Sequence, residues 1–423
     1  MSPTARKAAP KRKVPAKKPA SKAKASPIEY SMLLTTTLCL LALGVVMVFS
    51  ASSTTSLLGE AGDGAYYLKR TAIYGIFGLL AMKFLASGGV NVLRPLTVPL
   101  MFLSLFLLVA VMIPGVGIEV NGAKRWIGAG LFQIQPSEIA KLALILYGAQ
   151  LLASRPNMTR SIGEMGPFLL AVAVISGLVV LEPDLGTAMV ACFAAAAMLI
   201  AAGARMRDLA ILGGAIGVLI VLAILIEPYR MERLTGFLSP GSDPSGSGFQ
   251  ANQAQIALGS GGLFGVGLGE SLQKAFYLPE AHTDMIAAVI GEELGLVGIA
   301  MIVGLFSLFG YAGLQTARKA RDPYAKLLAA GLTSLVIIQA AINLFAVLGL
   351  APLTGVPLPF VSYGNSSLLT MLAAVGVLLN IARTPGARLR VVNGDRTTQS
   401  RSSRGRHSRA RSARAGSRRR ATG

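Results

Sequence analysis

Residues 252–295 read NQAQIALGSGGLFGVGLGESLQKAFYLPEAHTDMIAAVIGEELG, and the character of this stretch changes abruptly past its middle. Amides and glycines lead into a polar segment, Glu280 to Asp284, and a long apolar segment begins at Met285. Because an apolar run of this length predicts a membrane-spanning helix, Asp284 is expected where the bilayer meets water. An enzyme that acts on a lipid-linked substrate would need a proton acceptor at that depth.

The composition of the whole chain is that of a polytopic membrane protein. Of the 423 residues, 53% are hydrophobic and only 14% are charged, which excludes an ordinary soluble globular domain. The two cysteines, Cys39 and Cys192, both lie in apolar runs, so no structural disulfide, zinc cluster or thiol nucleophile is expected. We also expect no cleavable signal peptide, because the first apolar run is too long.

The net charge of +21 is concentrated in the two ends of the chain. Residues 1–30 contain nine Lys or Arg and residues 381–423 contain thirteen Arg, against one acidic residue in each range. We therefore predict disordered basic tails at 1–30 and 383–423 rather than a folded nucleic-acid-binding groove. Beside a membrane such tails are expected to contact anionic lipid headgroups, and no nucleic acid partner is expected.

Ten segments between the tails are long and apolar enough to cross a membrane, which takes about 20 residues. We predict an all-α integral membrane domain over residues 31–382, with helices near 31–51, 69–86, 94–113, 137–154, 166–182, 185–203, 208–227, 284–315, 327–350 and 363–382. Only the residues 182–184 separate the fifth helix from the sixth, so a tight hairpin is expected there.

Basic residues place the predicted loops on two sides of the membrane. Both tails are basic, and so are alternate links between the helices, which contain Lys83, Arg94, Arg155, Arg160, Arg205, Arg207, Arg318, Lys319, Arg321 and Lys326. By the positive-inside rule these links and both termini are cytoplasmic. The opposite side receives the loops 52–68, 114–136, 182–184, 228–283 and 351–362. Loop 228–283, between the seventh and eighth helices, is longer than a connection needs, and such loops are usually functional.

Asp284 is the leading candidate for a catalytic base, although a carboxylate at this position can also simply cap the following helix. Its neighbours His282 and Thr283 are interpreted as residues that orient the loop. The only other histidine, His407, lies in the C-terminal tail, so a histidine-rich metal site is not expected.

Charged residues inside the predicted helices form a second group of candidates, because an ionisable side chain in the membrane is costly. Glu292 lies about 80° around an ideal helix from Asp284, so the two side chains are candidates to line one cavity. Glu292 and Glu293 are alternatively explained by pairing with a buried Lys or Arg. Glu138 and Lys141, spaced i, i+3, are expected to form an ion pair that either belongs to a functional site or clamps two helices together.

Cations in the outer loops form a third group. Arg125 beside Trp126 places a guanidinium and an amphipathic ring at interface depth. Such a guanidinium can hold a pyrophosphate through two hydrogen bonds, and Lys124 and Lys274 are candidates to add charge there. The glycines between residues 259 and 269 match neither the dinucleotide nor the phosphate-loop fingerprint, and we interpret them as permitting a re-entrant or tightly packed segment.

Five ordered blocks of the sequence resemble the SEDS family (shape, elongation, division and sporulation) of integral membrane proteins. The blocks are NGAKRWIGAGLFQIQPSEIAK (121–141), EPDLGTA (182–188), NQAQIALGSGGLFGVGLGES (252–271), YLPEAHTDMIAAVIGEELG (277–295) and PLTGVPLPFVSYGNSS (352–367). The resemblance covers roughly residues 30–382 and implies the same ten-helix fold. The segment PEAHTD resembles the division-associated FtsW-like branch more than the elongation-associated RodA-like branch. Asn365 departs from the family, which usually has a second glycine there, but Asn tolerates unusual backbone angles.

The resemblance implies a peptidoglycan glycosyltransferase that polymerises lipid II, an undecaprenyl-pyrophosphate-linked disaccharide pentapeptide, during cell division. The catalytic aspartate of the family corresponds to Asp284, which would take the proton from the acceptor GlcNAc 4-hydroxyl. Undecaprenyl pyrophosphate leaves, and its charge would be met by Arg125, Lys124, Lys274 or a divalent cation, Mg or Mn. The candidate substrate-binding residues are Lys124, Arg125, Trp126, Glu138, Lys141, Gln253, Lys274, His282, Thr283, Glu292 and Ser362.

The resemblance also implies a location and partners. The protein would lie in the bacterial inner membrane at the division septum, beside a class B penicillin-binding protein that cross-links the strands and other membrane proteins of the division complex. Three alternatives are open: an elongation-type polymerase, a scaffold that acts through its tails, and a lipid II flippase with a polar path built from Glu138, Lys141, Glu292 and Glu293.

Overall fold

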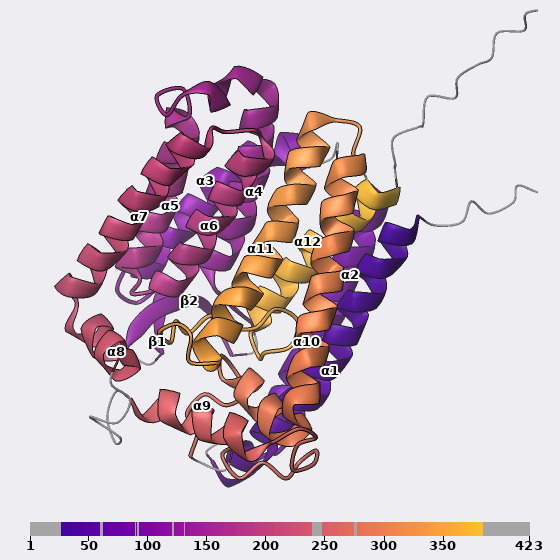
Figure 1. Ribbon diagram of the computed structural model, residues 1–423, viewed down its shortest axis with the longest axis vertical. Coiled ribbons are helices and arrows are strands. Elements are labelled where there is room, and N and C mark those ends of the chain that lie inside the picture. Colours follow the sequence, from indigo (N-terminus) through magenta and orange to yellow (C-terminus); the bar gives the residue numbers. More distant parts are fainter. Residues whose placement is uncertain are drawn as a thin grey trace, which may run out of the picture. The chain divides into compact units, whose positions relative to one another are not determined.

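The computed structural model describes residues 27–59, 62–88, 90, 93–120, 122–130, 132–238, 248–274 and 277–383. The predicted tails at 1–30 and 383–423 lie outside the described residues except for 27–30 and Arg383, so their disorder and lipid contacts stay predictions. Within the described residues the fold is predominantly helical, as expected (Figure 1).

A helix occupies each of the ten predicted segments in the described part of the chain. These helices are α1 Ile28–Leu58, α2 Tyr66–Gly88, α3 Leu93–Met112, α4 Pro136–Ser154, α5 Gly166–Leu181, α6 Leu185–Ala201, α7 Met206–Ile226, α10 Ile286–Lys319, α11 Pro323–Val347 and α12 Asn365–Arg383. Seven of them, all except α4, α5 and α6, are long and apolar enough to cross a membrane. The chain is thus built as a multi-pass membrane protein, whereas ten crossings remain a prediction.

Local sequence explains where several helices begin. Pro136 and Pro323 stand in the first turns of α4 and α11, where a missing N–H costs no hydrogen bond. Asp184 caps α6, because its carboxylate accepts a 3.0 Å hydrogen bond from the main-chain N–H of Thr187. This cap closes the tight hairpin predicted between α5 and α6.

Loop 114–136 folds into a small sheet, so the prediction of a purely α-helical fold is wrong at this loop. The strands β1 Gly117–Val120, β2 Ala123–Ala129 and β3 Phe132–Ile134 pair in sequence order, and both pairs are antiparallel. Positive φ angles at Gly122 and Gly130 form the turns between them. Strands this short carry little periodic signal, because cross-strand pairing stabilises them more than their own pattern does.

The long loop 228–283 also contains helices, α8 Pro228–Leu238 and α9 Phe249–Ser260. Beyond α9, a glycine-rich segment packs against the first turns of α10, with four main-chain hydrogen bonds between residues 262–267 and 292–297. Gly295 has a φ of 67°, which interrupts the regular helix at that point. The predicted tightly packed segment is therefore present.

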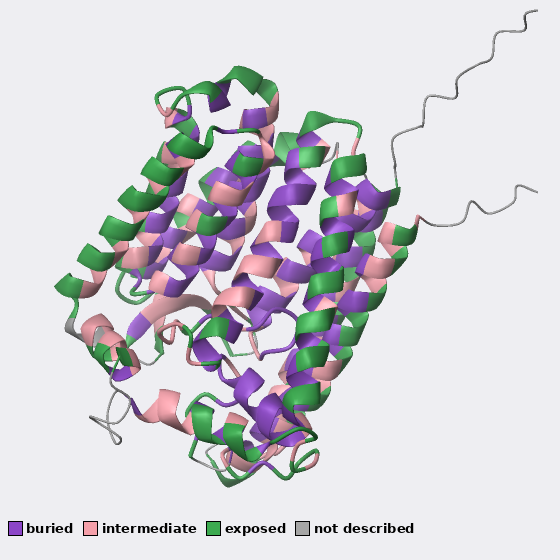
Figure 2. Cartoon of the chain, viewed as in Figure 1, coloured by how far each residue is buried: buried purple, intermediate pink, exposed green. Residues whose placement is uncertain are grey.

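The centre of the bundle is formed by α11 and α12, in which 72% and 78% of the apolar window is buried. None of the corresponding window of α7 is buried, and Figure 2 shows α7 with mostly exposed residues along its length. The central pair is therefore the scaffold from which a site can be positioned most rigidly.

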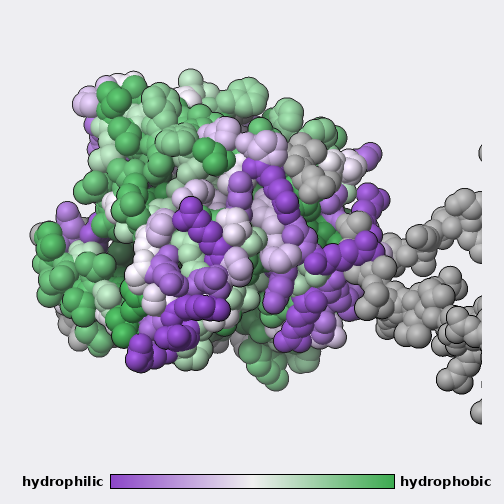
Figure 3. Space-filling model, turned by 90° about the horizontal axis from the view of Figure 1, so that it is seen from above, coloured by the Kyte–Doolittle hydropathy of each residue, from purple (hydrophilic) through white to green (hydrophobic). Residues whose placement is uncertain are grey.

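The links predicted to share one side of the membrane meet at one end of the bundle. Ion pairs join Lys319 to Glu29 and Arg94 to Asp322, which brings together the starts of α1, α3 and α11 and the end of α10. Seen from above, hydrophilic residues gather across this end and hydrophobic residues occupy much of its margin (Figure 3). The predicted outer loops meet at the opposite end, where the main-chain N–H of Tyr363 donates to the carbonyl of His282 at 2.9 Å.

Candidate active site

Asp284 lies directly before α10, at the end of the bundle where the predicted outer loops meet. Its side chain is buried, with 8% of the residue surface exposed. The hydroxyl of Thr283 donates to the Oδ1 of Asp284 at 3.3 Å. Met285, rather than Asp284, occupies the N-cap position of α10, and no side chain caps that helix. Asp284 therefore does not cap α10 in this structure.

The surroundings of Asp284 give it the proton affinity of a base that works near neutral pH. Burial is the main cause that raises the pKa of Asp284 to about 6, and the carboxylate of Glu280 adds to the rise. The guanidinium of Arg233 acts in the opposite direction. A carboxylate with this pKa is ionised at pH 7 yet still accepts a proton readily.

Two amides on α11 position the main chain around Asp284. The Nδ2 of Asn343 donates to the carbonyl oxygens of Asp284 at 2.7 Å and Val356 at 2.8 Å. One turn away, the Nε2 of Gln339 donates to the carbonyl oxygen of Pro357 at 3.0 Å. The sequence analysis did not single out Asn343 or Gln339. Their position inside an apolar helix was a signal, because polar side chains there usually have buried hydrogen-bond partners.

The expected ion pair between Glu138 and Lys141 is present. The Nζ of Lys141 lies 2.8 Å from the Oε1 of Glu138, and both side chains are almost completely buried. The same ammonium donates to the Oε1 of Gln339 at 2.7 Å, and the hydroxyl of Thr370 donates to Glu138 at 3.2 Å. The pair therefore clamps α4 to α11 and α12, and Gln339 connects it to the loop beside Asp284.

Lys274 and Glu293 form a second buried ion pair, with 2.8 Å between Nζ and Oε1. The hydroxyl of Ser50 donates to the Oε2 of Glu293 at 2.8 Å, so the pair joins the long loop to α1 and α10. Glu292 accepts hydrogen bonds from the main-chain N–H of Leu272, at 3.0 Å, and from the hydroxyl of Ser271. Glu293 is thus paired with a buried lysine, whereas Glu292 is held by a hydroxyl and a main-chain N–H of the long loop. These contacts favour a structural role for each glutamate over a cavity shared with Asp284.

Arg125 lies on β2 and contacts the hairpin between α5 and α6. Its Nε donates to the carbonyl oxygen of Glu182 at 3.1 Å, and its Nη2 donates to that of Pro183. Burial raises the pKa of Glu182 to about 8, with a further rise from Asp184, while Arg125 opposes both. No hydrogen-bond partner is found for either carboxylate oxygen of Glu182 among the described residues. Lys124 and Trp126, its neighbours on β2, are half-buried.

Three further residues predicted to bind substrate, His282, Ser362 and Gln253, lie in or near the loops around Asp284. The ring of His282 packs against Tyr67 and Tyr363, with centroids 4.1 and 5.5 Å apart. The hydroxyl of Ser362 accepts a 2.8 Å hydrogen bond from the N–H of Leu358 and so shapes the turn before α12. Gln253 is half-buried on α9.

Arg233 on α8 is a functional candidate that sequence reasoning missed. Its Nη1 donates to the carbonyl oxygen of Leu353 at 3.1 Å. A Cβ placed on Gly355 would lie 4.0 Å from this Nη1 and 4.0 Å from the Oδ2 of Asp284. The signal in the sequence was the pair of arginines, Arg230 and Arg233, in the long outer loop. The sequence does not indicate, however, that the α8 segment approaches Asp284.

The divalent cation suggested by the sequence would need ligands from the substrate as well as from the protein. No group of three or more His, Cys, Asp or Glu side chains among the described residues lies close enough to hold a metal ion. A cation held mainly by protein oxygens needs more ligands than Asp284 and its neighbour Glu280 supply. The Mg or Mn suggested by the sequence therefore stays a prediction, and no step of the chemistry below passes through it.

Comparison with known proteins identifies the family of this chain. The family model described as cell cycle protein, covering FtsW, RodA and SpoVE, matches residues 30–386. The chain belongs to the FtsW/RodA/SpoVE family. The match spans the whole membrane portion and confirms the family expected from the five sequence blocks.

Relatives within the FtsW/RodA/SpoVE family align over most of their length. A probable peptidoglycan glycosyltransferase FtsW of Trichlorobacter lovleyi is 42% identical over 371 residues, which cover 86% of this chain and 96% of the relative. Stage V sporulation protein E of Bacillus subtilis is 44% identical over 358 residues, which cover 83% of this chain and 96% of the relative.

Solved structures of family members share the fold. A chain from the structure described as "Structural coordination of polymerization and crosslinking by a peptidoglycan synthase complex" has a TM-score of 0.69 and 30% identity, and the match covers 85% of this chain and 98% of that chain. The crystal structure of the Thermus thermophilus rod shape determining protein RodA has a TM-score of 0.62 and 29% identity, covering 83% of this chain and 95% of that chain.

Proposed function

We propose that this protein is a peptidoglycan glycosyltransferase that polymerises lipid II into glycan strands during cell division. The observation that carries the proposal is the buried carboxylate of Asp284, whose pKa is raised to about 6, at the junction between the long loop and α10. Membership of a family with relatives named probable peptidoglycan glycosyltransferase FtsW supports the activity and the division branch.

The proposed reaction is a displacement at the anomeric carbon of the donor sugar. Asp284 takes the proton from the 4-hydroxyl of the acceptor GlcNAc, and that oxygen forms a bond to the anomeric carbon. The bond between this carbon and the pyrophosphate oxygen breaks, so undecaprenyl pyrophosphate leaves with the bonding electrons. The proton on Asp284 is then released to water. General-base assistance of this kind typically contributes about 10²–10⁴-fold, so positioning and charge stabilisation supply the remainder.

Around the base we assign substrate contacts to residues at the same end of the bundle. His282 and Thr283 hold the loop that carries Asp284, whereas Lys124, Trp126 and Gln253 remain proposed contacts to substrate. By contrast, the contacts of Glu138, Lys141, Lys274, Glu292 and Ser362 support a role in holding the scaffold.

The proposal places the protein in the bacterial inner membrane at the septum, with ten crossings and both termini in the cytoplasm. A class B penicillin-binding protein is the proposed partner, together with other membrane proteins of the division complex. The likeness to a chain from a peptidoglycan synthase complex supports such a partner.

Reconstitution with labelled lipid II tests the proposal. We expect glycan strands with the full-length protein and its partner, and none with Asp284→Asn, which keeps the shape of the side chain. Asp63→Asn is a matched control, because Asp63 is an exposed carboxylate paired with Lys69 in another outer loop. Undiminished polymer from the Asp284→Asn protein would refute the assignment of the base. If the protein is instead a flippase, both variants should move labelled lipid II across the vesicle membrane at the same rate.

A further inference from the structure

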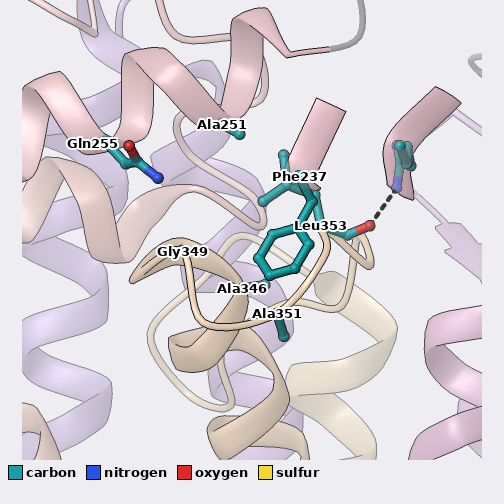
Figure 4. A pocket seen from close by; sticks show the side chains of 8 residues that line it. Phe237, Ala251, Gln255, Ala346, Gly349, Ala351 and Leu353 are labelled. Atoms are coloured by element: carbon teal, nitrogen blue, oxygen red, sulfur yellow. Dashed lines mark hydrogen bonds between the residues drawn. The ribbon is translucent and has the colours of Figure 1, made fainter. Parts of the chain in front are cut away.

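A pocket lies close to Asp284, between α8, α9 and the segment that follows α11. Its lining is apolar, with side chains such as Phe237, Ala346 and Leu353, apart from the guanidinium of Arg233 and the amide of Gln255 (Figure 4). The enclosed part of the pocket is small, about 20 Å³, and the rest of the hollow opens to solvent, so a larger ligand would lie along its apolar wall. Apolar walls with a cation at one position fit an amphiphile that joins an anionic group to a hydrocarbon chain.

Arg233 and Asp284 both approach the open space beside Gly355. The Nη1 of Arg233 and the Oδ2 of Asp284 each lie 4.0 Å from the place where a Cβ of residue 355 would stand. Gly355 has a φ of 71°, a conformation that favours glycine, so the space between the two charged groups is left free of a side chain. Because the base and this cation border the same open space, both are within reach of a sugar that reacts there, the base for the attacking hydroxyl and the cation for the leaving group.

Two cations proposed from the sequence for this purpose have partners elsewhere. Lys274 is paired with Glu293 at 2.8 Å, and Arg125 donates to carbonyl oxygens of the hairpin between α5 and α6. Arg230, one turn before Arg233 on α8, donates to the carbonyl oxygens of Ala223 and Val180, both at 3.0 Å. Arg233 also donates to a carbonyl oxygen, that of Leu353, but it is the cation whose charge lowers the pKa of Asp284.

We propose that Arg233 binds the pyrophosphate of the lipid-linked donor and of the departing product, while the apolar wall of the pocket holds the first part of the polyprenyl chain. This inference rests on the proposed function and adds the site of the leaving group to it. A guanidinium pairs with phosphate oxygens through two parallel hydrogen bonds and stabilises the negative charge that develops as the bond breaks.

Binding of undecaprenyl pyrophosphate to the full-length protein tests the inference independently of catalysis. Arg233→Gln removes the charge and keeps a polar side chain at this position. We expect its Kd for undecaprenyl pyrophosphate to rise at least tenfold, with a smaller rise for Arg233→Lys. The uncharged alcohol undecaprenol, measured in the same detergent, should bind both variants as it binds the parent protein.

Arg230→Gln is the matched control, because Arg230 lies on the same helix but its guanidinium donates to the carbonyl oxygens of Ala223 and Val180, near the ends of α7 and α5. Its Kd for undecaprenyl pyrophosphate should stay within twofold of the parent value. Unchanged pyrophosphate binding by Arg233→Gln would overturn the inference. So would an equal loss of pyrophosphate and undecaprenol binding, because that result would mean that Arg233 only holds α8 in place.

Asp284→Asn distinguishes a failure of this inference from a failure of the proposed function. This variant should lose polymerisation while it binds undecaprenyl pyrophosphate normally. If it polymerises, the assigned base is wrong, whereas a normal Kd for Arg233→Gln refutes only the leaving-group site.

Discussion

The side-chain amide of Asn343 donates a 2.7 Å hydrogen bond to the main-chain carbonyl of Asp284. The same Nδ2 donates to the carbonyl of Val356, next to Gly355. One amide on the central helix α11 therefore holds both the proposed base and the segment that lies beside it and Arg233. Rigid support of this kind matters because catalytic groups lose effectiveness when displaced by about 1 Å.

Replacing Asn343 by leucine should reduce polymerisation about tenfold or more while the protein still folds. The change keeps the approximate volume but leaves two carbonyl groups without their donor, which costs about 1–3 kcal/mol per buried group. Initial rates with labelled lipid II and the thermal midpoint provide the measurement. Asn380→Leu is the control, since its amide donates to Ala86 at the opposite end of the bundle. Equal rate losses in the two variants would contradict a positioning role for Asn343.

The rate of polymerisation should fall as the pH drops through about 6. Burial raises the pKa of Asp284 to about 6, and only the ionised carboxylate accepts the proton, so each further pH unit below it costs about tenfold. Arg233 lowers this pKa, and Arg233→Gln should therefore move the acidic limb to higher pH. A pH–rate profile measured under single-turnover conditions checks both statements. A limb that stays in place in the Arg233 variant would show that the guanidinium does not act on Asp284.

The protein should become progressively less stable as the pH rises from about 4.5 to about 8 because of Glu182. Its pKa is raised in the folded state from an ordinary value of 4.5 to about 8, so folding favours the protonated carboxyl. The stability that this group contributes is complete below about pH 4.5 and is lost as the pH rises through its folded pKa. Glu182→Gln should raise the thermal midpoint at pH 9 and leave it nearly unchanged at pH 4.5. Parallel pH dependence in the two proteins would rule out this cause.

Substituting alanine at two glycines of α10 should have opposite effects. Gly295 has a φ of 67°, and a Cβ there would lie 2.6 Å from the carbonyl oxygen of Leu263, so Gly295→Ala should destabilise the protein by about 1–3 kcal/mol or more. Gly304 lies in the same helix, and apart from the neighbouring backbone of that helix no atom stands within 4 Å of the place that an added methyl group would take, so Gly304→Ala should stabilise the protein by about 0.5–1 kcal/mol. Thermal midpoints in detergent would reveal the difference; similar values would argue against the close packing at Gly295.

Removing Lys141 alone should be more harmful than removing both members of its ion pair. Lys141→Met leaves the buried carboxylate of Glu138 without its counter-charge, which costs about 3–5 kcal/mol. Adding Glu138→Gln removes the unpaired charge and should restore much of the stability. Unfolding in mixed detergent micelles provides the free energies for a double-mutant cycle. Additive effects would mean that the two side chains do not interact.

The candidate site was only partly predictable from the sequence. Asp284 and the ion pair between Glu138 and Lys141 were identified because their signals are local: a polar residue before an apolar run, and two charges three residues apart. Lys274 was predicted to serve the pyrophosphate, but its partner Glu293 lies on α10 across a folded loop. This partner could not be predicted, because the path of the long loop depends on its packing against α10 and not on the hydrophobic pattern of the loop sequence.

The sequence by itself determined the helical segments, the tight hairpin at 182–184 and the family, because hydropathy and motif spacing are properties of neighbouring residues. Only the tertiary structure decided that the loop 114–136 forms a sheet and that Asn343 and Arg233 reach the surroundings of Asp284. Asn343 is 59 residues from Asp284, and Arg233 is 120 residues from its partner Leu353. Hydrogen bonds and charge pairs depend on distance in space, and the packing of helices brings such distant residues together.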